Sequence, residues 1–128
     1  HSVAEALLAV HRSYLTQLIP LVKAQKLVAM AHITGGGLTD NLPRVLPGHL
    51  DASIETGSWQ IPALFRFLIE KSQMPVEDAR RSFNLGVGMV VIAKKPDAGD
   101  VLLALKNAGE AAWVIGELVP GKGEVVYR

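Results

Sequence analysis

The chain contains no cysteine, few aromatic residues and few charged ones. Without cysteine, its 128 residues have neither a disulfide framework nor a thiolate ligand for a metal. Charged residues make up 20% of the sequence, below the average of about a quarter in globular domains. The net charge of +1 gives no support to binding of nucleic acid or of an anionic membrane. No apolar run approaches the roughly 20 residues of a membrane span, and no signal peptide is recognisable, so we expect a cytoplasmic protein.

Apolar residues account for 49% of the sequence, a high share for a chain with so little charge. One interpretation is a well-filled core rich in Val, Leu and Ala. The interpretation that we favour is that part of the apolar surface faces a partner domain or chain. A length of 128 residues is sufficient for one domain with its own core.

Hydrophobic periodicity and turn residues predict an alternation of helices and strands. The expected strands cover residues 27–33, 50–55, 86–93, 113–119 and 124–127. The expected helices cover residues 3–8, 14–25, 61–71, 75–82 and 97–107, with a short or irregular helix over 38–46. This pattern indicates a sheet covered by helices.

The most informative stretch is residues 31–47, with the sequence AHITGGGLTDNLPRVLP. Its three glycines separate a strand-like run from a helix-like one. Glycine lacks a Cβ atom, so its backbone can approach a ligand closely and adopt conformations closed to other residues. The first N–H groups of the following helix have no partner within that helix, which favours an anion such as a phosphate. A plain tight turn is the alternative, because the spacing matches neither the dinucleotide motif nor the Walker motif.

Polar residues flank the glycines on both sides. Arg44 has the planar guanidinium that suits a phosphate, but it also lies four residues after Asp40, where an ordinary surface ion pair is the alternative. His32 lies at the end of an apolar strand and is either a structural group or a donor to a ligand.

Three segments in the same order resemble one enzyme family. They are residues 31–47, residues 81–90 (RSFNLGVGMV) and residues 110–117 (EAAWVIGE). Together they resemble the phosphoribosylformylglycinamidine cyclo-ligases, also called aminoimidazole ribonucleotide synthetases. The resemblance extends over essentially the whole chain and concerns the C-terminal half of those enzymes. Departures from the family pattern at Val10, His11 and Leu85 lie outside the glycine-rich segment.

The resemblance implies an α+β fold, with a three-layer α/β/α domain and a mixed sheet. Residues 1–128 would be the C-terminal domain of a cyclo-ligase whose N-terminal half is absent. The implied reaction is the ATP-dependent closure of the imidazole ring of formylglycinamidine ribonucleotide, which gives 5-aminoimidazole ribonucleotide, ADP and phosphate in purine biosynthesis. The implied cofactors are ATP and magnesium, bound mainly by the N-terminal half. The implied partners are that half and a second copy in a homodimer.

The resemblance also implies a set of site residues. His32 is expected to be catalytic, and no metal ligand is expected. The expected substrate- or phosphate-binding residues are Thr34, Gly35, Gly36, Gly37, Asp40, Asn41 and Arg44. Two alternatives remain open: the isolated chain is a catalytically inert binding module, or it belongs to a relative with the same two-half architecture, such as thiamine-monophosphate kinase.

Overall fold

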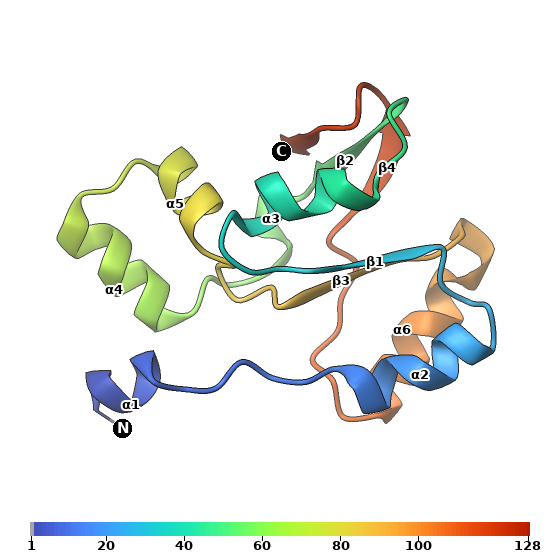
Figure 1. Ribbon diagram of the computed structural model, residues 1–128, viewed down its shortest axis with the longest axis horizontal. Helices are drawn as coiled ribbons and strands as arrows, with labels where there is room; N and C mark the ends of the chain where they lie inside the picture. Colours follow the sequence, from blue (N-terminus) through green and yellow to red (C-terminus); the bar gives the residue numbers. More distant parts are fainter. Residues whose placement is uncertain (1) are drawn as a thin grey trace.

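Helices and strands alternate along the chain in the computed structural model, which describes residues 2–128 (Figure 1). The helices are α1 (Val3–Leu7), α2 (Leu15–Lys23), α3 (Gly37–Asn41), α4 (Ala63–Ser72), α5 (Val76–Ser82) and α6 (Ala98–Asn107). Short 3-10 helices are η1 (Leu42–Val45), η2 (Thr56–Ser58) and η3 (Lys95–Asp97). The strands are β1 (Ala29–His32), β2 (Leu50–Ile54), β3 (Met89–Ile92), β4 (Gly116–Pro120) and β5 (Val125–Tyr127).

The described strands form two sheets. β1 and β3 pair antiparallel, with Ala31 opposite Val90. The second sheet has the order β4-β2-β5, in which β2 is antiparallel to β4 and parallel to β5. The α+β class and the mixed sheet predicted from the sequence are therefore confirmed.

Four strands begin later than the sequence predicts, and the shift is largest for β3 and β4. Gly86 has a φ of 96° and lies in a turn, so the strand expected from residue 86 begins only at Met89. Residues 113–115 precede β4 without belonging to it, although the carbonyl oxygen of Ile115 accepts a hydrogen bond from the N–H of Glu55. Helix 38–46 is irregular as expected, because Pro43 lies where α3 gives way to η1.

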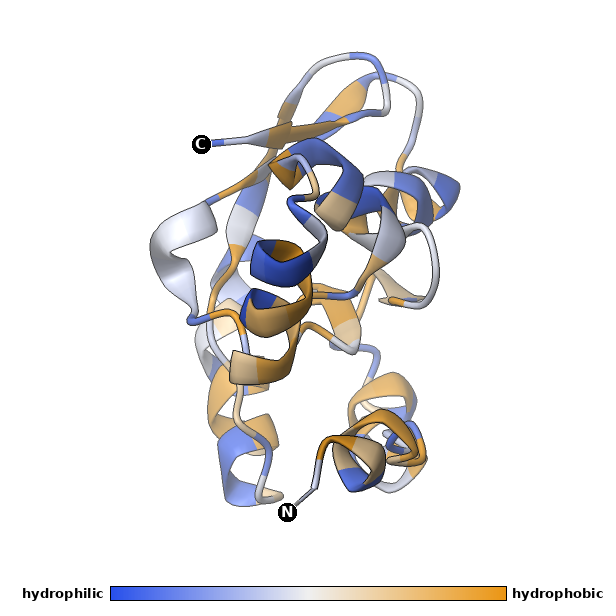
Figure 2. Ribbon diagram, turned by 90° about the vertical axis from the view of Figure 1, so that its left-hand side faces the viewer, coloured by the Kyte–Doolittle hydropathy of each residue, from blue (hydrophilic) through white to orange (hydrophobic). Residues whose placement is uncertain are grey.

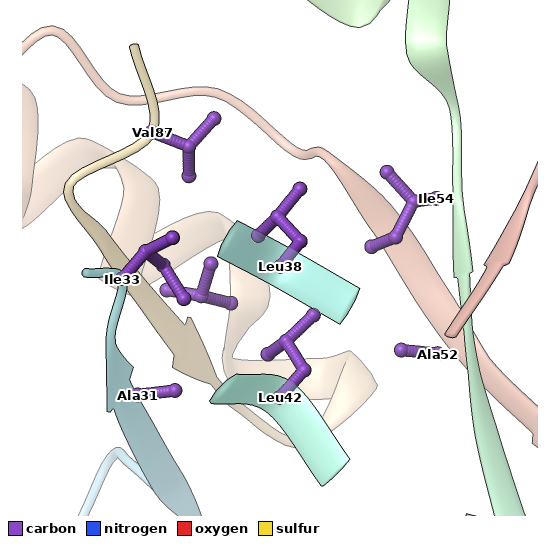
Figure 3. Close-up of a cluster of buried hydrophobic side chains, with 8 residues drawn as sticks. Ala31, Ile33, Leu38, Leu42, Ala52, Ile54 and Val87 are labelled. Carbon is purple, nitrogen blue, oxygen red and sulfur yellow. The ribbon is translucent and has the colours of Figure 1, made fainter. Parts of the chain in front are cut away.

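The main core joins the two sheets through the helix that follows the glycines (Figure 3). Leu38 and Leu42 lie between the β1–β3 pair and Ile54 of β2. Leu42 is 1% exposed, and burial of such a side chain contributes about 1.5–3 kcal/mol. The cluster consists of Ala31, Ile33, Leu38, Leu42, Ala52, Ile54, Val87 and Val90.

A large part of the apolar surface remains exposed. On α2, Leu18 and Leu21 are buried, whereas Leu15, Ile19 and Val22 are exposed. Figure 2 shows that apolar residues are spread over the helices as well as the strands. This distribution agrees with the interpretation that the chain faces a partner. No helix within residues 2–128 has both the length and the apolar character needed to cross a membrane.

Candidate functional site

The segment of residues 34–37, called here the glycine loop, connects β1 to α3 (Figure 1). The N–H of Gly37 donates to the carbonyl oxygen of Thr34 at 3.0 Å, which closes a tight turn. The N–H of Asp40 donates to the carbonyl oxygen of Gly36 at 3.1 Å. Gly36 has a φ of 99°, a conformation that other residues rarely adopt. The loop is therefore a defined turn between a paired strand and a helix anchored in the core.

Several backbone N–H groups of this turn have no partner. Within residues 2–128, the N–H groups of Gly35, Gly36 and Leu38 donate to no carbonyl and to no side chain. Gly35 is exposed, and a Cβ atom at this position would have no neighbour within 4 Å. Unpaired N–H groups beside open space are suited to an oxyanion, which accepts strong charge-assisted hydrogen bonds.

The third glycine of the loop has a different role. Gly37 is buried, with a φ of 57°, and a Cβ atom here would collide with the carbonyl oxygen of Arg80 in α5. It would also lie 2.7 Å from the carbonyl oxygen of Phe83. Gly37 is therefore needed for the close packing of α3 on α5, whereas Gly35 leaves the surface open.

Asn41 is buried and points back toward the loop. Its side chain is 4% exposed, and its Nδ2 donates to the carbonyl oxygens of Gly37 at 2.8 Å and Gly35 at 3.3 Å. A buried amide that is hydrogen-bonded in this way stabilises the shape of the turn. The sequence predicts that Asn41 contacts the ligand directly. In the structure, its side chain is buried and donates to carbonyl groups of the loop.

His32 lies at the end of β1 and is exposed, as is Thr34. Its ring packs against that of His11, with the two ring centroids 4.4 Å apart and the planes inclined by 58°. His11 comes from the segment between α1 and α2, and sequence reasoning found no motif that included it. The contact between the two imidazoles joins residues that are 21 positions apart in the sequence.

Asp40 and Arg44 are both exposed, and no ion pair joins them in the described chain. The four-residue spacing predicts a shared helix face only if the helix continues. Here α3 ends at Asn41 and the tighter η1 begins at Leu42, so the two side chains are no longer one α-helical turn apart. Arg44 is consequently available for a ligand.

A second polar contact supports α3 from the C-terminal strand. The hydroxyl groups of Thr39 and Tyr127 are 2.7 Å apart, and the guanidinium of Arg80 lies 4.3 Å from the centre of the Tyr127 ring. Burial raises the pKa of the Tyr127 hydroxyl, and the hydrogen bond to Thr39 and the charge of Arg80 oppose this effect. Sequence reasoning missed this contact, because 88 residues separate its two hydroxyl groups and no motif links them.

Neither of two cavities in the described structure is formed by the loop. Their volumes are about 430 and 520 Å³, and residues 32–41 line neither of them. Among residues 2–128, no three His, Asp or Glu side chains are grouped closely enough to hold a metal ion. The glycine loop thus lies outside both of these cavities, with Thr34 and Gly35 exposed at the surface.

Comparison with known proteins relates the chain to one family. Residues 1–128 match the family described as AIR synthase related protein, C-terminal domain. A phosphoribosylformylglycinamidine cyclo-ligase of Alkaliphilus oremlandii is 39% identical over 125 residues, which cover 98% of this chain and 37% of the relative. The enzyme of the same name from Bacillus pumilus is 41% identical over 121 residues, covering 94% of this chain and 35% of the relative.

A bifunctional purine biosynthetic protein of Schizosaccharomyces pombe is 39% identical over 117 residues, covering 91% of this chain and 15% of the relative. The chain spans little more than a third of the length of the two bacterial cyclo-ligases. The match over every residue, together with these identities, shows that the chain belongs to the AIR synthase related family and corresponds to its C-terminal domain.

Proposed function

We propose that this chain is part of an ATP-dependent ligase that closes the imidazole ring of formylglycinamidine ribonucleotide in purine biosynthesis. Within that enzyme, the glycine loop holds a phosphate group of the substrate or of ATP. The observation that carries the role of the loop is the set of unpaired N–H groups at Gly35, Gly36 and Leu38, with open space beside Gly35. The choice of reaction is supported by the relatives named cyclo-ligase.

The chemistry assigns specific tasks to the residues of this chain. ATP supplies the phosphoryl group that makes the substrate's amide oxygen a leaving group, and an amine nitrogen of the same molecule then forms the new C–N bond as phosphate departs. The loop N–H groups bind and orient a phosphate, so that the reacting ends are held together. His32 donates a hydrogen bond to the amide oxygen, and Arg44 forms a charge-assisted contact with phosphate. Asp40, exposed in the first turn of α3, orients the substrate by accepting a hydrogen bond from one of its donors.

Magnesium in this proposal is held by another part of the polypeptide, since the described residues offer no grouped ligands for it. We infer that an N-terminal half supplies the metal ligands, most of the nucleotide-binding residues and the contacts of a homodimer. Support comes from the exposed apolar residues Leu15, Ile19 and Val22 of α2, which a further domain or chain would cover. We also propose that the protein is cytoplasmic, in line with the proposed biosynthetic reaction.

We also propose that the domain has three layers. In Figure 1, α3 lies on one side of the β1–β3 pair, and α2 and α6 lie on the other. This arrangement is consistent with a sheet between two layers of helices.

The proposed reaction is tested by measuring ring closure with ATP and formylglycinamidine ribonucleotide. The natural full-length polypeptide should release ADP only in the presence of the substrate. The 128-residue chain alone should be inactive, and mixing it with a separately produced N-terminal half should restore measurable turnover. A verified full-length protein without ring closure would refute the proposed reaction. Turnover by the isolated chain would refute the need for a second half.

A further inference from the structure

His32 has a fixed backbone but no polar partner for its side chain. It lies opposite Met89 in the β1–β3 pair, and the N–H of Ile33 donates to the carbonyl oxygen of Gly88 at 3.0 Å, so the pairing continues past His32. Ile33 is buried, whereas His32 and Thr34 are exposed, as expected for side chains that alternate along a strand. Within residues 2–128, the imidazole of His32 makes no hydrogen bond and no ion pair. Polar contacts therefore do not select one of the roughly six rotamers open to a histidine side chain.

The ring of His11 restricts the side chain of His32 instead. The centroids of the two rings are 4.4 Å apart, which is as close as aromatic pairs usually approach, and the planes are inclined by 58°. Rotation about χ1 or χ2 of His32 moves its ring, so the ring of His11 excludes every rotamer that would bring both rings into the same space. Tyr14 adds a third ring, whose centroid lies 6.2 Å from that of His11.

The segment that carries His11 is anchored by the residues that follow it. Residues 9–14 belong to no helix or strand, so local structure does not hold them in place. Arg12 Nη2 lies 2.6 Å from Glu110 Oε1, and the side chain of Glu110 is only 11% exposed. The hydroxyl of Tyr14 fills the space beside Gly88, where a Cβ atom would collide with it. These two contacts with distant parts of the chain determine where the ring of His11 lies.

We propose that His11 is a positioning residue, whose ring holds the imidazole of His32 in one orientation before the substrate binds. This inference rests on the proposed function, in which His32 donates a hydrogen bond to the amide oxygen of the substrate. In this role, His11 contacts neither the substrate nor ATP. A donor that is already oriented loses less freedom in the transition state, which raises kcat rather than the affinity for the substrate. Selection of one among about six rotamers corresponds to a rate effect of up to about sixfold.

The kinetic test uses the natural full-length polypeptide with ATP and formylglycinamidine ribonucleotide. His11→Ala removes the ring and should lower kcat about threefold to sixfold, while KM for the substrate stays within about twofold. His11→Phe keeps a ring without the imidazole nitrogens and should restore kcat to within about twofold of the parent protein. His49→Ala removes another exposed histidine, just before β2, and should leave both constants unchanged. An unchanged kcat in His11→Ala, a rise in KM alone, or a kcat for His11→Phe as low as that of His11→Ala would each overturn the proposal.

A second measurement on the same proteins does not depend on catalysis. Diethyl pyrocarbonate modifies accessible imidazole nitrogens, and peptide mass spectrometry gives the rate at each histidine. His32 should react faster in His11→Ala, which uncovers one face of its ring, than in the parent protein, His11→Phe or His49→Ala. Equal rates in all four proteins would overturn the proposal even where ring closure is normal. If His11→Ala does not fold, His11→Gln, which also removes the ring, takes its place in both measurements.

Failure of this proposal can be told apart from failure of the proposed function. A parent protein that does not close the ring would refute the proposed reaction and, with it, this role of His11. An active parent protein whose kcat is insensitive to His11→Ala would refute only the positioning role of His11.

Discussion

The side-chain amide of Asn41 donates to the carbonyl oxygen of Gly37 at 2.8 Å, so a residue inside α3 determines the shape of the loop that precedes the helix. A second bond, of 3.3 Å, reaches the carbonyl oxygen of Gly35. Both bonds are made by one nitrogen atom of a side chain that is 4% exposed. The turn that forms the candidate phosphate site is therefore stabilised by the buried side chain of Asn41.

Replacement of Asn41 by leucine tests this support. Asn41→Leu keeps the approximate size of the side chain and removes both donors, which leaves the carbonyl oxygen of Gly35 without this partner. We expect the free energy of unfolding to fall by about 1–3 kcal/mol in urea denaturation. Asn107→Leu, at an exposed position at the end of α6, is the control, with an expected change within about 0.5 kcal/mol. Equal unfolding midpoints for the two variants would contradict a stabilising role of Asn41.

The glycines of the loop should respond very differently to alanine. Gly37→Ala places a methyl group against the carbonyl oxygen of Arg80 at a φ of 57°, and we expect a loss of stability of about 2–4 kcal/mol. Gly35→Ala meets no atom within 4 Å and should change stability by less than about 1 kcal/mol. Thermal or urea unfolding of the two variants provides the measurement. Similar losses in both would show that α3 does not pack on α5 as closely as described.

Removal of the Arg44 side chain should affect binding without affecting stability. Arg44 is exposed and has no ion pair within residues 2–128, so Arg44→Ala should change the unfolding free energy by less than about 0.5 kcal/mol. Loss of one charge-assisted contact with phosphate should weaken substrate binding by about 1.5–3 kcal/mol in the full-length protein. Arg66→Ala, on the exposed part of α4, is the matched control. An unchanged substrate affinity would identify Arg44 as an ordinary surface charge.

Acid should destabilise the turn between β4 and β5 through Asp51. One carboxylate oxygen of Asp51 accepts hydrogen bonds from the N–H groups of Glu124 at 2.9 Å and Lys122 at 2.7 Å. These bonds, that of Glu124 first, lower the pKa of the carboxyl group. Because the folded pKa lies below the unfolded one, the stabilisation is fully present above the unfolded pKa of about 3.9 and is lost as the pH falls through the folded pKa.

Asp51→Asn isolates this contribution. The variant should be less stable than the parent protein at neutral pH, and the difference should shrink as the pH falls below about 4. Urea midpoints measured from about pH 7 to about pH 3 give the comparison. Lys122→Ala retains the backbone N–H and should preserve most of the effect. A difference between Asp51→Asn and the parent protein that is independent of pH would show that the charge of Asp51 does not stabilise the turn.

Local sequence was sufficient to predict most of the secondary structure. Pro75 followed by Glu77 and Asp78 predicts the start of a helix, and α5 begins at Val76 with both acids in its first turn. Pro43 predicts an irregular helix, and the structure changes there from α3 to η1. The errors lie at the ends of helices and strands: α2 ends at Lys23 instead of residue 25, and β3 begins at Met89 instead of residue 86.

The site was only partly predictable. The glycines and His32 are recognised from a contiguous motif, since a turn between a strand and a helix is a local property. Three features of the site depend on how α3 packs: Asn41 faces inward, Arg44 forms no ion pair with Asp40, and Tyr127 contacts Thr39. Such contacts join residues through space and leave no regular spacing in the sequence.

By itself, the sequence determined the order of helices and strands, the place of the glycine loop and the family, because these follow from local backbone preferences and contiguous motifs. Only the tertiary structure decided the division of the strands into two sheets and the different roles of Gly35 and Gly37. The physical reason is that burial and close contact depend on which distant segments pack against each other. The role of a residue therefore depends on its neighbours in space.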